Sequence, residues 1–214
     1  MVPARPQDMD LAAKLGRAEM RAALSHKTAA ASATPGPCPV IATRRLVLRP
    51  HRLADAGAIS ESLGDFQVTR MLARVPQPYH RQDALDWLVP QVSGILPDWT
   101  LAITSGDDTH IGLVGIELRH DHWHLGYWLN RFYWGKGYMS EAVAAALERF
   151  FRRMPQTTVF SGAFADNLAS LRIQKKLGFR IIDANQIFSL SRNAMAPHVE
   201  TMLLPQDLRV ITGQ

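Results

Sequence analysis

Cysteine, long apolar runs and dense stretches of basic residues are all scarce in this 214-residue sequence. Cys38 is the only cysteine, so an intramolecular disulfide and a cysteine-cluster metal site are excluded, and a reducing compartment such as the cytoplasm is favoured. The longest uninterrupted apolar stretches, such as residues 142–147, are far shorter than the about 20 residues that a membrane-spanning helix needs. The formal charge of +5 suits an anionic ligand, but without a dense Lys/Arg stripe we expect neither a nucleic acid nor a membrane as partner.

The N-terminal segment differs in composition from the rest of the chain. Apolar spacing over residues 10–24 predicts a short amphipathic helix, and the small residues and prolines of residues 28–39 are typical of a linker. No apolar segment precedes a cleavage site, so a secretory signal is not expected. We therefore expect a mobile extension over residues 1–42, one domain over residues 43–205 and a short tail over residues 206–214.

The predicted domain alternates strands and helices. In its second half the order strand, helix, strand, helix, strand implies at least one parallel pair, which predicts a mixed α/β sheet. Capping residues and apolar spacing predict helices over residues 55–63, 82–93, 140–153 and 167–177. The predicted strands are residues 44–50, 99–104, 111–118, 123–129, 157–163, 179–191 and 199–204.

A glycine-containing loop, residues 130–139, joins a predicted strand to a predicted helix. Gly135 and Gly137 allow a tight turn and a close approach to a ligand, while the free amides and dipole of the helix start attract a phosphate or pyrophosphate. Ordinary turn chemistry is the alternative interpretation. Ser140 stands where a Gly-x-Gly-x-x-Gly motif needs its last glycine, which disfavours a Rossmann dinucleotide binder, and no P-loop motif occurs.

Four motifs, which follow one another along the chain in the family's order, resemble the GCN5-related N-acetyltransferases (GNAT). The closer resemblance is to the RimJ/RimL-like branch, which acetylates ribosomal-protein N-termini. Residues 133–138 read Tyr-Trp-Gly-Lys-Gly-Tyr and are followed by Glu141-Ala142. Residues 167–179 begin Asn-x-x-Ser and end Lys-x-Gly-Phe, which also describes a capped helix. The remaining matches are residues 44–50 and 126–129.

The resemblance implies one mixed sheet of about seven strands, splayed between the fourth and fifth and flanked by about four helices. It implies acetyl-CoA as the donor and no metal, with the pantetheine arm between residues 125–129 and 157–163. The residues expected to contact acetyl-CoA are Leu129, Trp134, Gly135, Lys136, Gly137, Tyr138, Met139, Asn167, Ser170 and Lys176. Met139 is bulkier than the residue that the family prefers there.

The expected reaction is attack of a neutral amine on a thioester, in a ternary complex. At pH 7 neutralising an α-amine with a pKa near 8 costs about 1.4 kcal/mol, against about 4.6 kcal/mol for lysine. Many relatives carry a glutamate where His124 stands, and a histidine with a pKa near 6.5 suits an α-amine. The alternatives are that His124 faces solvent, or that Glu117 or Glu200 is the base.

Many relatives use a tyrosine to protonate the departing thiolate, at the position of Gln174. Gln174 has no ionisable proton, so the resemblance leaves Ser170 as the candidate for this hydrogen bond. Asn167 is expected to bind the pantetheine amide or the acceptor, with helix capping as the alternative or additional role.

Three histidines, His120, His122 and His124, lie close together, but they bridge two predicted strands and are not expected to share a face or hold a metal.

From the four motifs together we expect an N-acetyltransferase, monomeric or homodimeric, that acts on a protein N-terminus. A small-amine acetyltransferase and a non-catalytic acyl-CoA-binding module are the alternatives.

Overall fold

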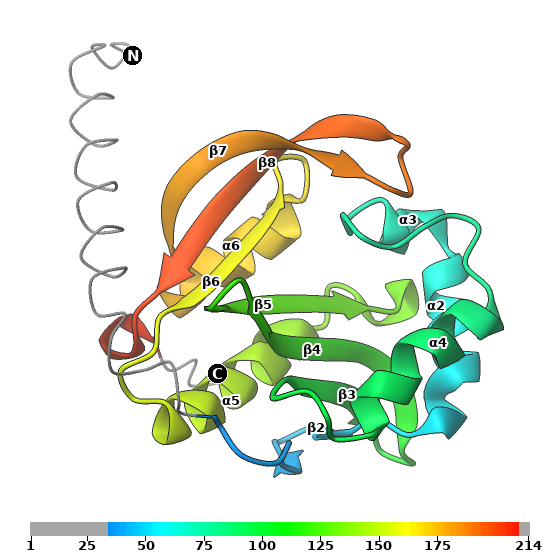
Figure 1. Ribbon diagram of the computed structural model, residues 1–214, viewed down its shortest axis with the longest axis horizontal. Coiled ribbons are helices and arrows are strands. Elements are labelled where there is room, and N and C mark those ends of the chain that lie inside the picture. Colours follow the sequence, from blue (N-terminus) through cyan, green and yellow to red (C-terminus); the bar gives the residue numbers. More distant parts are fainter. Residues whose placement is uncertain (1–33, 210–214) are drawn as a thin grey trace.

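The computed structural model describes residues 34–209, and in this part of the chain eight strands form one mixed sheet (Figure 1). The strands are β1 (Ile41–Ala42), β2 (Leu46–Pro50), β3 (Trp99–Ser105), β4 (Thr109–Arg119), β5 (His122–Leu129), β6 (Val159–Phe164), β7 (Arg180–Ser189) and β8 (Ala194–Leu203). The α-helices are α2 (Ala56–Gly64), α3 (Phe66–Thr69), α4 (Arg81–Val92), α5 (Tyr138–Arg153) and α6 (Leu168–Leu177). The strand order is β1-β2-β3-β4-β5-β6-β8-β7.

The sheet splits at its only parallel pair among the described strands. β5 and β6 pair at Trp123↔Val159 and His124↔Phe160, and their ladder ends there. Beyond this point β6, β7 and β8 tilt away from the other strands (Figure 1). The mixed α/β sheet and the predicted splay are therefore confirmed; the short β1 makes the count eight and moves the splay to β5 and β6.

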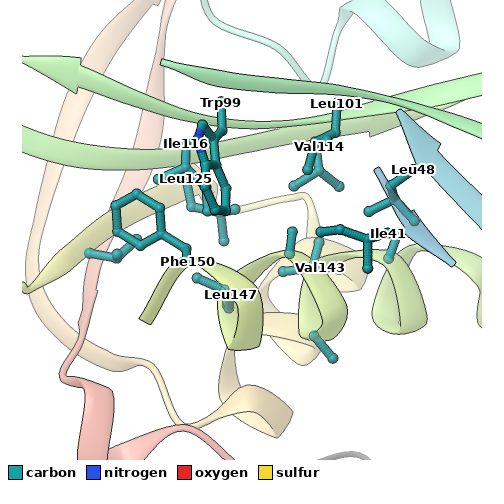
Figure 2. Packing of buried hydrophobic residues seen from close by; sticks show 14 of the residues in the cluster. Ile41, Leu48, Trp99, Leu101, Val114, Ile116, Leu125, Val143, Leu147 and Phe150 are labelled. Atoms are coloured by element: carbon teal, nitrogen blue, oxygen red, sulfur yellow. The ribbon is translucent and has the colours of Figure 1, made fainter. Parts of the chain in front are cut away.

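Helix α5 packs on one face of the sheet and forms most of the core with it (Figure 2). The rings of Trp99 and Phe150 meet edge to face at 5.6 Å between centroids, and both side chains are fully buried. Truncating a buried aromatic ring of this kind typically costs about 3–5 kcal/mol. Helices α2 and α4 pack on the opposite face, where Trp128 contacts their apolar cluster. Because side chains alternate along a strand, Leu125 and Tyr127 face α5 and Gly126 and Trp128 face α2 and α4.

The predicted helices are present, with small differences at their ends. Helix α6 is capped by Asn167 and ends at Gly178, whose φ of 103° is left-handed, as its sequence predicts. Strand β8 begins at Ala194 rather than at residue 199. Pro197, which has no amide hydrogen to donate, lies inside this strand, and its carbonyl oxygen accepts from the Ala165 amide just beyond the end of β6. In an antiparallel strand the nitrogen and the carbonyl of one residue point to the same side. The Pro197 nitrogen therefore also points beyond the end of β6, where no ladder hydrogen bond is lost.

Residues 34–42, expected in the extension, pack against the domain. Trp99 Nε1 donates to the Gly36 carbonyl at 2.8 Å, and Ile41 is part of the core. The expected tail also makes contact, since the Arg209 amide donates to the Leu177 carbonyl at 3.0 Å. The predicted helix over residues 10–24 lies outside the described residues. No helix between residues 34 and 209 has the length and apolarity that crossing a membrane would require.

Candidate active site

The glycine loop forms the N-terminus of α5. Gly137 is the residue before the helix and has a left-handed φ of 76°, and Gly135 has a φ of 74°. The first intrahelical bond runs from the Glu141 amide to the Gly137 carbonyl at 3.2 Å. The amides of residues 138–140 therefore have no intrahelical acceptor, and together with the helix dipole they form an anion-binding cradle. We call residues 135–139 the cradle.

Arg45 holds the cradle from the side. Its Nε donates to Glu141 Oε2 at 2.7 Å, its Nη1 donates to the Lys136 carbonyl at 2.9 Å, and its guanidinium lies 4.5 Å from the centre of the Tyr138 ring. Thr43 Oγ1 donates to the other oxygen of Glu141 at 2.7 Å. Glu141 therefore anchors the segment before β2 to the start of α5. The sequence did not suggest that Arg45 would support the cradle in this way.

Three other residues expected to contact acetyl-CoA lie in different surroundings. Trp134 Nε1 donates to the Leu129 carbonyl at 2.7 Å, which fixes the loop between β5 and the cradle. Met139 is buried in the core at the first turn of α5, so its bulk is accommodated on the side away from the free amides. Lys176 is exposed in the last turn of α6 and is not among the residues that line the cleft described next.

A cleft of about 570 Å³ lies at the splay between β5 and β6. Ser161 Oγ donates to the Leu125 carbonyl at 3.0 Å, just past the last paired residues, and so bridges the two strands where they begin to separate. The cleft brings together predicted site residues from four elements and their ends. These residues are Glu117, His124, Asn167, Ser170 and Glu200.

Ser170, one of the residues that line this cleft, belongs to a hydrogen-bonded network. Its amide donates to Asn167 Oδ1 at 3.1 Å, which confirms the capping role of Asn167. Its Oγ is 2.8 Å from the Tyr127 hydroxyl and accepts from Gln174 Nε2 at 3.2 Å. Thr201 donates to Gln174 Oε1 at 2.8 Å, which orients the amide with its nitrogen toward Ser170. When Tyr127 donates to the Ser170 oxygen and Gln174 donates to its other lone pair, the serine hydrogen is free to be donated to a ligand.

His124 lines the cleft rather than facing solvent. It lies opposite Glu117 in the β4–β5 ladder, and its ring is 5.7 Å from that of Phe160. Burial, with a further contribution from the Arg119 charge, lowers the pKa of His124 to about 4. The expected value near 6.5 is therefore wrong, because the position is desolvated. His124 is neutral at pH 7 and is a weaker base than its residue type suggests.

The two alternative bases differ in their surroundings. Glu117 Oε2 accepts from Arg119 Nε at 2.9 Å and from Arg74 Nη2 at 3.2 Å, so two guanidinium groups already use this carboxylate. Glu200 accepts from Asn185 Nδ2 at 2.8 Å and forms no ion pair with a described residue. Of the two, only Glu117 accepts hydrogen bonds from guanidinium groups of described residues.

The family model described as acetyltransferase (GNAT) domain matches residues 45–180, more than half of the chain. The chain belongs to this family. One similar protein is the uncharacterized N-acetyltransferase YnaD of Bacillus subtilis (strain 168), which is 28% identical over 142 residues, 65% of this chain and 82% of YnaD. The chain is therefore a GNAT acetyltransferase, as its motifs indicated.

Two solved structures of similar fold hold forms of coenzyme A. RimJ of Mycobacterium smegmatis, in complex with CoA-disulfide, has a TM-score of 0.68 and 18% identity, with 82% of this chain and 91% of RimJ covered. RimL, a ribosomal L7/L12 alpha-N-protein acetyltransferase in complex with coenzyme A, has a TM-score of 0.68 and 15% identity, with 79% of this chain and 100% of RimL covered.

Two cleft residues of the GNAT domain were missed in the sequence. Tyr127 lies within the family-like segment 126–129, and strand alternation could have placed it on the face opposite His124, but its contact with Ser170 depends on the fold. Burial raises the pKa of Tyr127, so its hydroxyl keeps its proton at neutral pH. His198 was placed outside the predicted strand. Its Nδ1 is buried without a hydrogen-bond partner among the described residues, and its ring fills the space beside Gly162.

The histidine-rich stretch partly differs from expectation. His122 and His124 share one face, since both rings contact Phe160, at 5.1 and 5.7 Å between centroids. His120 lies in the turn, with a left-handed φ of 46°. Among residues 34–209 no group of three or more His, Cys, Asp or Glu side chains is arranged to hold a metal ion.

Proposed function

We propose that this GNAT enzyme transfers the acetyl group of acetyl-CoA to a protein N-terminal α-amine, by direct attack in a ternary complex. The observation that carries the proposal is the surroundings of two candidate bases at the cleft, His124 and Glu117. The pKa of His124 is lowered to about 4, and Glu117 is bound by two arginines. Such a site suits an amine that needs about 1.4 kcal/mol to become neutral at pH 7, and disfavours a lysine that needs about 4.6 kcal/mol.

The cradle and the splay supply the donor site in this proposal. The free amides after Gly137 would bind the pyrophosphate, and the gap between β5 and β6 would admit the pantetheine arm. The coenzyme A forms present in RimJ and RimL support this assignment. Leu129, the last residue of β5, and Asn167, which lines the cleft, would then contact the arm, whereas Lys176 would reach only the outer part of the ligand.

Ser170 is the proposed proton donor to the leaving group. The amine nitrogen attacks the carbonyl carbon, the C–S bond breaks with its electron pair on sulfur, and the Ser170 hydroxyl donates its hydrogen to that sulfur. Gln174 and Tyr127 orient the hydroxyl. The proton lost by the amine passes to His124 or water, and water returns a proton to the Ser170 oxygen, so the serine hydroxyl is restored and coenzyme A leaves as the thiol. This network, together with family membership, favours an enzyme over a non-catalytic acyl-CoA-binding module.

Peptides that each carry one free amine, either α or ε, test the proposal when coenzyme A release is followed from pH 6 to 9. We expect α-amines to react at least a hundredfold faster than ε-amines at pH 7, from a difference of about 3.3 kcal/mol in the cost of neutralising them. Efficient ε-amine acetylation at pH 7 would contradict it. Activity restricted to polyamines or aminoglycosides would identify a small-amine acetyltransferase instead. Binding of acetyl-CoA, with no coenzyme A released in the presence of any amine, would identify a binding module.

A further inference from the structure

The central strand β5 carries a glycine that the fold itself does not require. Gly126 has an ordinary extended backbone, outside the left-handed region. A Cβ added at this position would meet a single atom, Arg119 Nη2, at 3.9 Å. A glycine inside a strand costs conformational entropy and contributes no side-chain packing. The absence of a side chain at Gly126 therefore needs an explanation outside the packing of the protein.

Two neighbouring glycines show what a packing requirement looks like. A Cβ at Gly112 would lie 2.5 Å from the Trp128 carbonyl oxygen, and a Cβ at Gly162 would overlap the imidazole of His198. In both cases the protein fills the space that the glycine leaves. At Gly126 the space is left open.

The open space at Gly126 belongs to the cleft. Gly126 lines the cleft on the face away from α5, and it follows His124, the last β5 residue paired with β6. Along β5, Gly126 lies between His124 and Trp128 on the same face of the strand. The His124 ring in turn contacts Phe160 of β6. Gly126 thus forms a bare stretch of floor where the two strands separate, next to the proposed entry of the thioester. A glycine at such a position commonly marks close approach by a ligand.

A fixed guanidinium lies beside this floor. Arg119 donates through Nε and Nη2 to Glu117 Oε2, at 2.9 and 2.5 Å, and its side chain is 30% exposed. Its Nη1 makes no hydrogen bond with any residue in the described range. The carboxylate therefore holds the guanidinium in place and leaves donor capacity toward the cleft. A guanidinium in this position is suited to a carbonyl or carboxylate oxygen.

We propose that the first residue of the acceptor lies on the bare backbone at Gly126, with Arg119 binding the oxygen of the carbonyl group next to the reactive amine. The acceptor class is then an α-aminoacyl group, in which a single substituted carbon joins the amine to a carbonyl, and which a peptide N-terminus or a free amino acid can supply. This inference rests on the proposed α-amine acceptor and adds the two positions that select it.

A single added methyl group tests the floor. Gly126→Ala places a Cβ where the protein has room, so we expect an unchanged or slightly higher Tm and an acetyl-CoA Kd within twofold of the wild type. The acceptor KM should rise at least tenfold, for whichever amine the wild-type enzyme uses. Gly57→Ala is the matched control, because Gly57 is exposed on α2 with no atom within 4 Å of its added Cβ. Unchanged acceptor kinetics in Gly126→Ala, or an equal loss of acetyl-CoA affinity, would overturn the proposal.

Three acceptors that share the benzyl side chain test Arg119: a phenylalanyl dipeptide amide, phenylalanine and phenethylamine. Their rates are compared after division by the fraction of each amine that is neutral. We expect the wild type to prefer the two carbonyl-containing acceptors over phenethylamine by at least tenfold, and their ratio tells the peptide source from the free amino acid. Arg119→Met should abolish this preference and Arg119→Lys should keep part of it; a loss of stability alone would lower all three rates equally. Equal use of phenethylamine by the wild type would overturn the proposal, whereas acetylation of ε-amines instead of α-amines would overturn the proposed function.

Discussion

The hydroxyl oxygens of Tyr127 and Ser170 lie 2.8 Å apart, joining the central strand β5 to helix α6 across the base of the cleft. The Tyr127 hydroxyl is also 3.3 Å from the Ser170 carbonyl, to which it can donate. Both hydroxyls contact Gln174 Nε2, at 3.2 Å for Ser170 and 3.5 Å for Tyr127. The position of the Ser170 oxygen is therefore set by the protein before any ligand binds, which is the condition for efficient stabilisation of a charge that develops during reaction.

Ser170→Ala should lower turnover by roughly a hundredfold, within the range for a positioned proton donor, and should change acetyl-CoA affinity much less. The reason is that the hydrogen bond to sulfur strengthens only as the thiolate forms. Tyr127→Phe should lower turnover by a smaller factor, because Gln174 still orients the serine. Single-turnover kinetics and acetyl-CoA titration separate the two quantities. If Ser170→Ala turns over at the wild-type rate, the serine is a structural helix residue and water protonates the thiolate.

Gly137→Val should weaken acetyl-CoA binding at least tenfold. A valine at a φ of 76° is strained, and its Cβ would lie 3.4 Å from Arg45 Nη2, so it would disturb both the turn and the arginine that holds the cradle. Isothermal titration measures the affinity, and circular dichroism checks the fold. Gly137→Asn separates the two causes, because asparagine tolerates the left-handed conformation. Full affinity in a folded Gly137→Val variant would show that the pyrophosphate lies elsewhere.

Arg45→Met should weaken acetyl-CoA binding several-fold with little effect on turnover at saturation. The variant loses the bonds to Glu141 and to the Lys136 carbonyl, so the cradle becomes less ordered in the free enzyme and must be ordered on binding. The exposed neighbour Arg44, changed to methionine, is the matched control for the loss of one positive charge. Equal effects of the two substitutions would indicate general electrostatic attraction rather than a clamp.

Local signals in the sequence were sufficient for much of the fold. Helix α6 carries its own start and stop in Asn167 and Gly178, and the cradle carries two glycines at a strand-to-helix junction. Strand β8 begins at Ala194 rather than at residue 199, and only the point at which β6 ends explains why Pro197 is tolerated within it. The short strand β1 depends on pairing with β2 rather than on its own two residues.

The site was harder to predict, because its chemistry depends on contacts between distant segments. Residue type assigned His124 a pKa near 6.5, whereas burial beside Phe160 and the charge of Arg119 lower it to about 4. The meeting of Tyr127 with Ser170 requires the positions of β5 and α6 in three dimensions. The open space at Gly126 is likewise visible only when the neighbours of a Cβ are known.

The pH dependence of the rate should reflect the acceptor rather than His124. With its pKa lowered to about 4, His124 stays neutral from pH 6 to 9, so kcat/KM should show no inflection near 6.5 and should rise toward the pKa of the α-amine, near 8. His124→Ala should lower the rate without changing the shape of this profile. An inflection near 6.5 that disappears in His124→Ala would show that the histidine titrates in the working range. A rate indifferent to the substitution would show that His124 is not the base.

Stability should fall as the pH drops from about 6.5 toward 4, and His110 should account for a measurable part of this loss. Its ring lies 5.7 Å from that of His51 and 5.8 Å from Trp128, and neither of its nitrogens has a hydrogen-bond partner among the described residues. Burial lowers the pKa of His110 to about 4, with a smaller contribution from His51.

The sign follows from proton linkage. Below the unfolded pKa near 6.5 the unfolded chain binds a proton at His110 that the native state does not bind until about pH 4. The contribution of His110 is therefore fully present above pH 6.5 and is lost as the pH falls toward 4, by about 3 kcal/mol at most. His110→Phe keeps a ring in this position and removes the titration, so urea unfolding between pH 7 and 4.5 should show a shallower loss than in the wild type. Carboxylates titrate in both proteins and cancel in the comparison; parallel loss in the two would mean that His110 binds its proton in the native state as readily as in the unfolded chain.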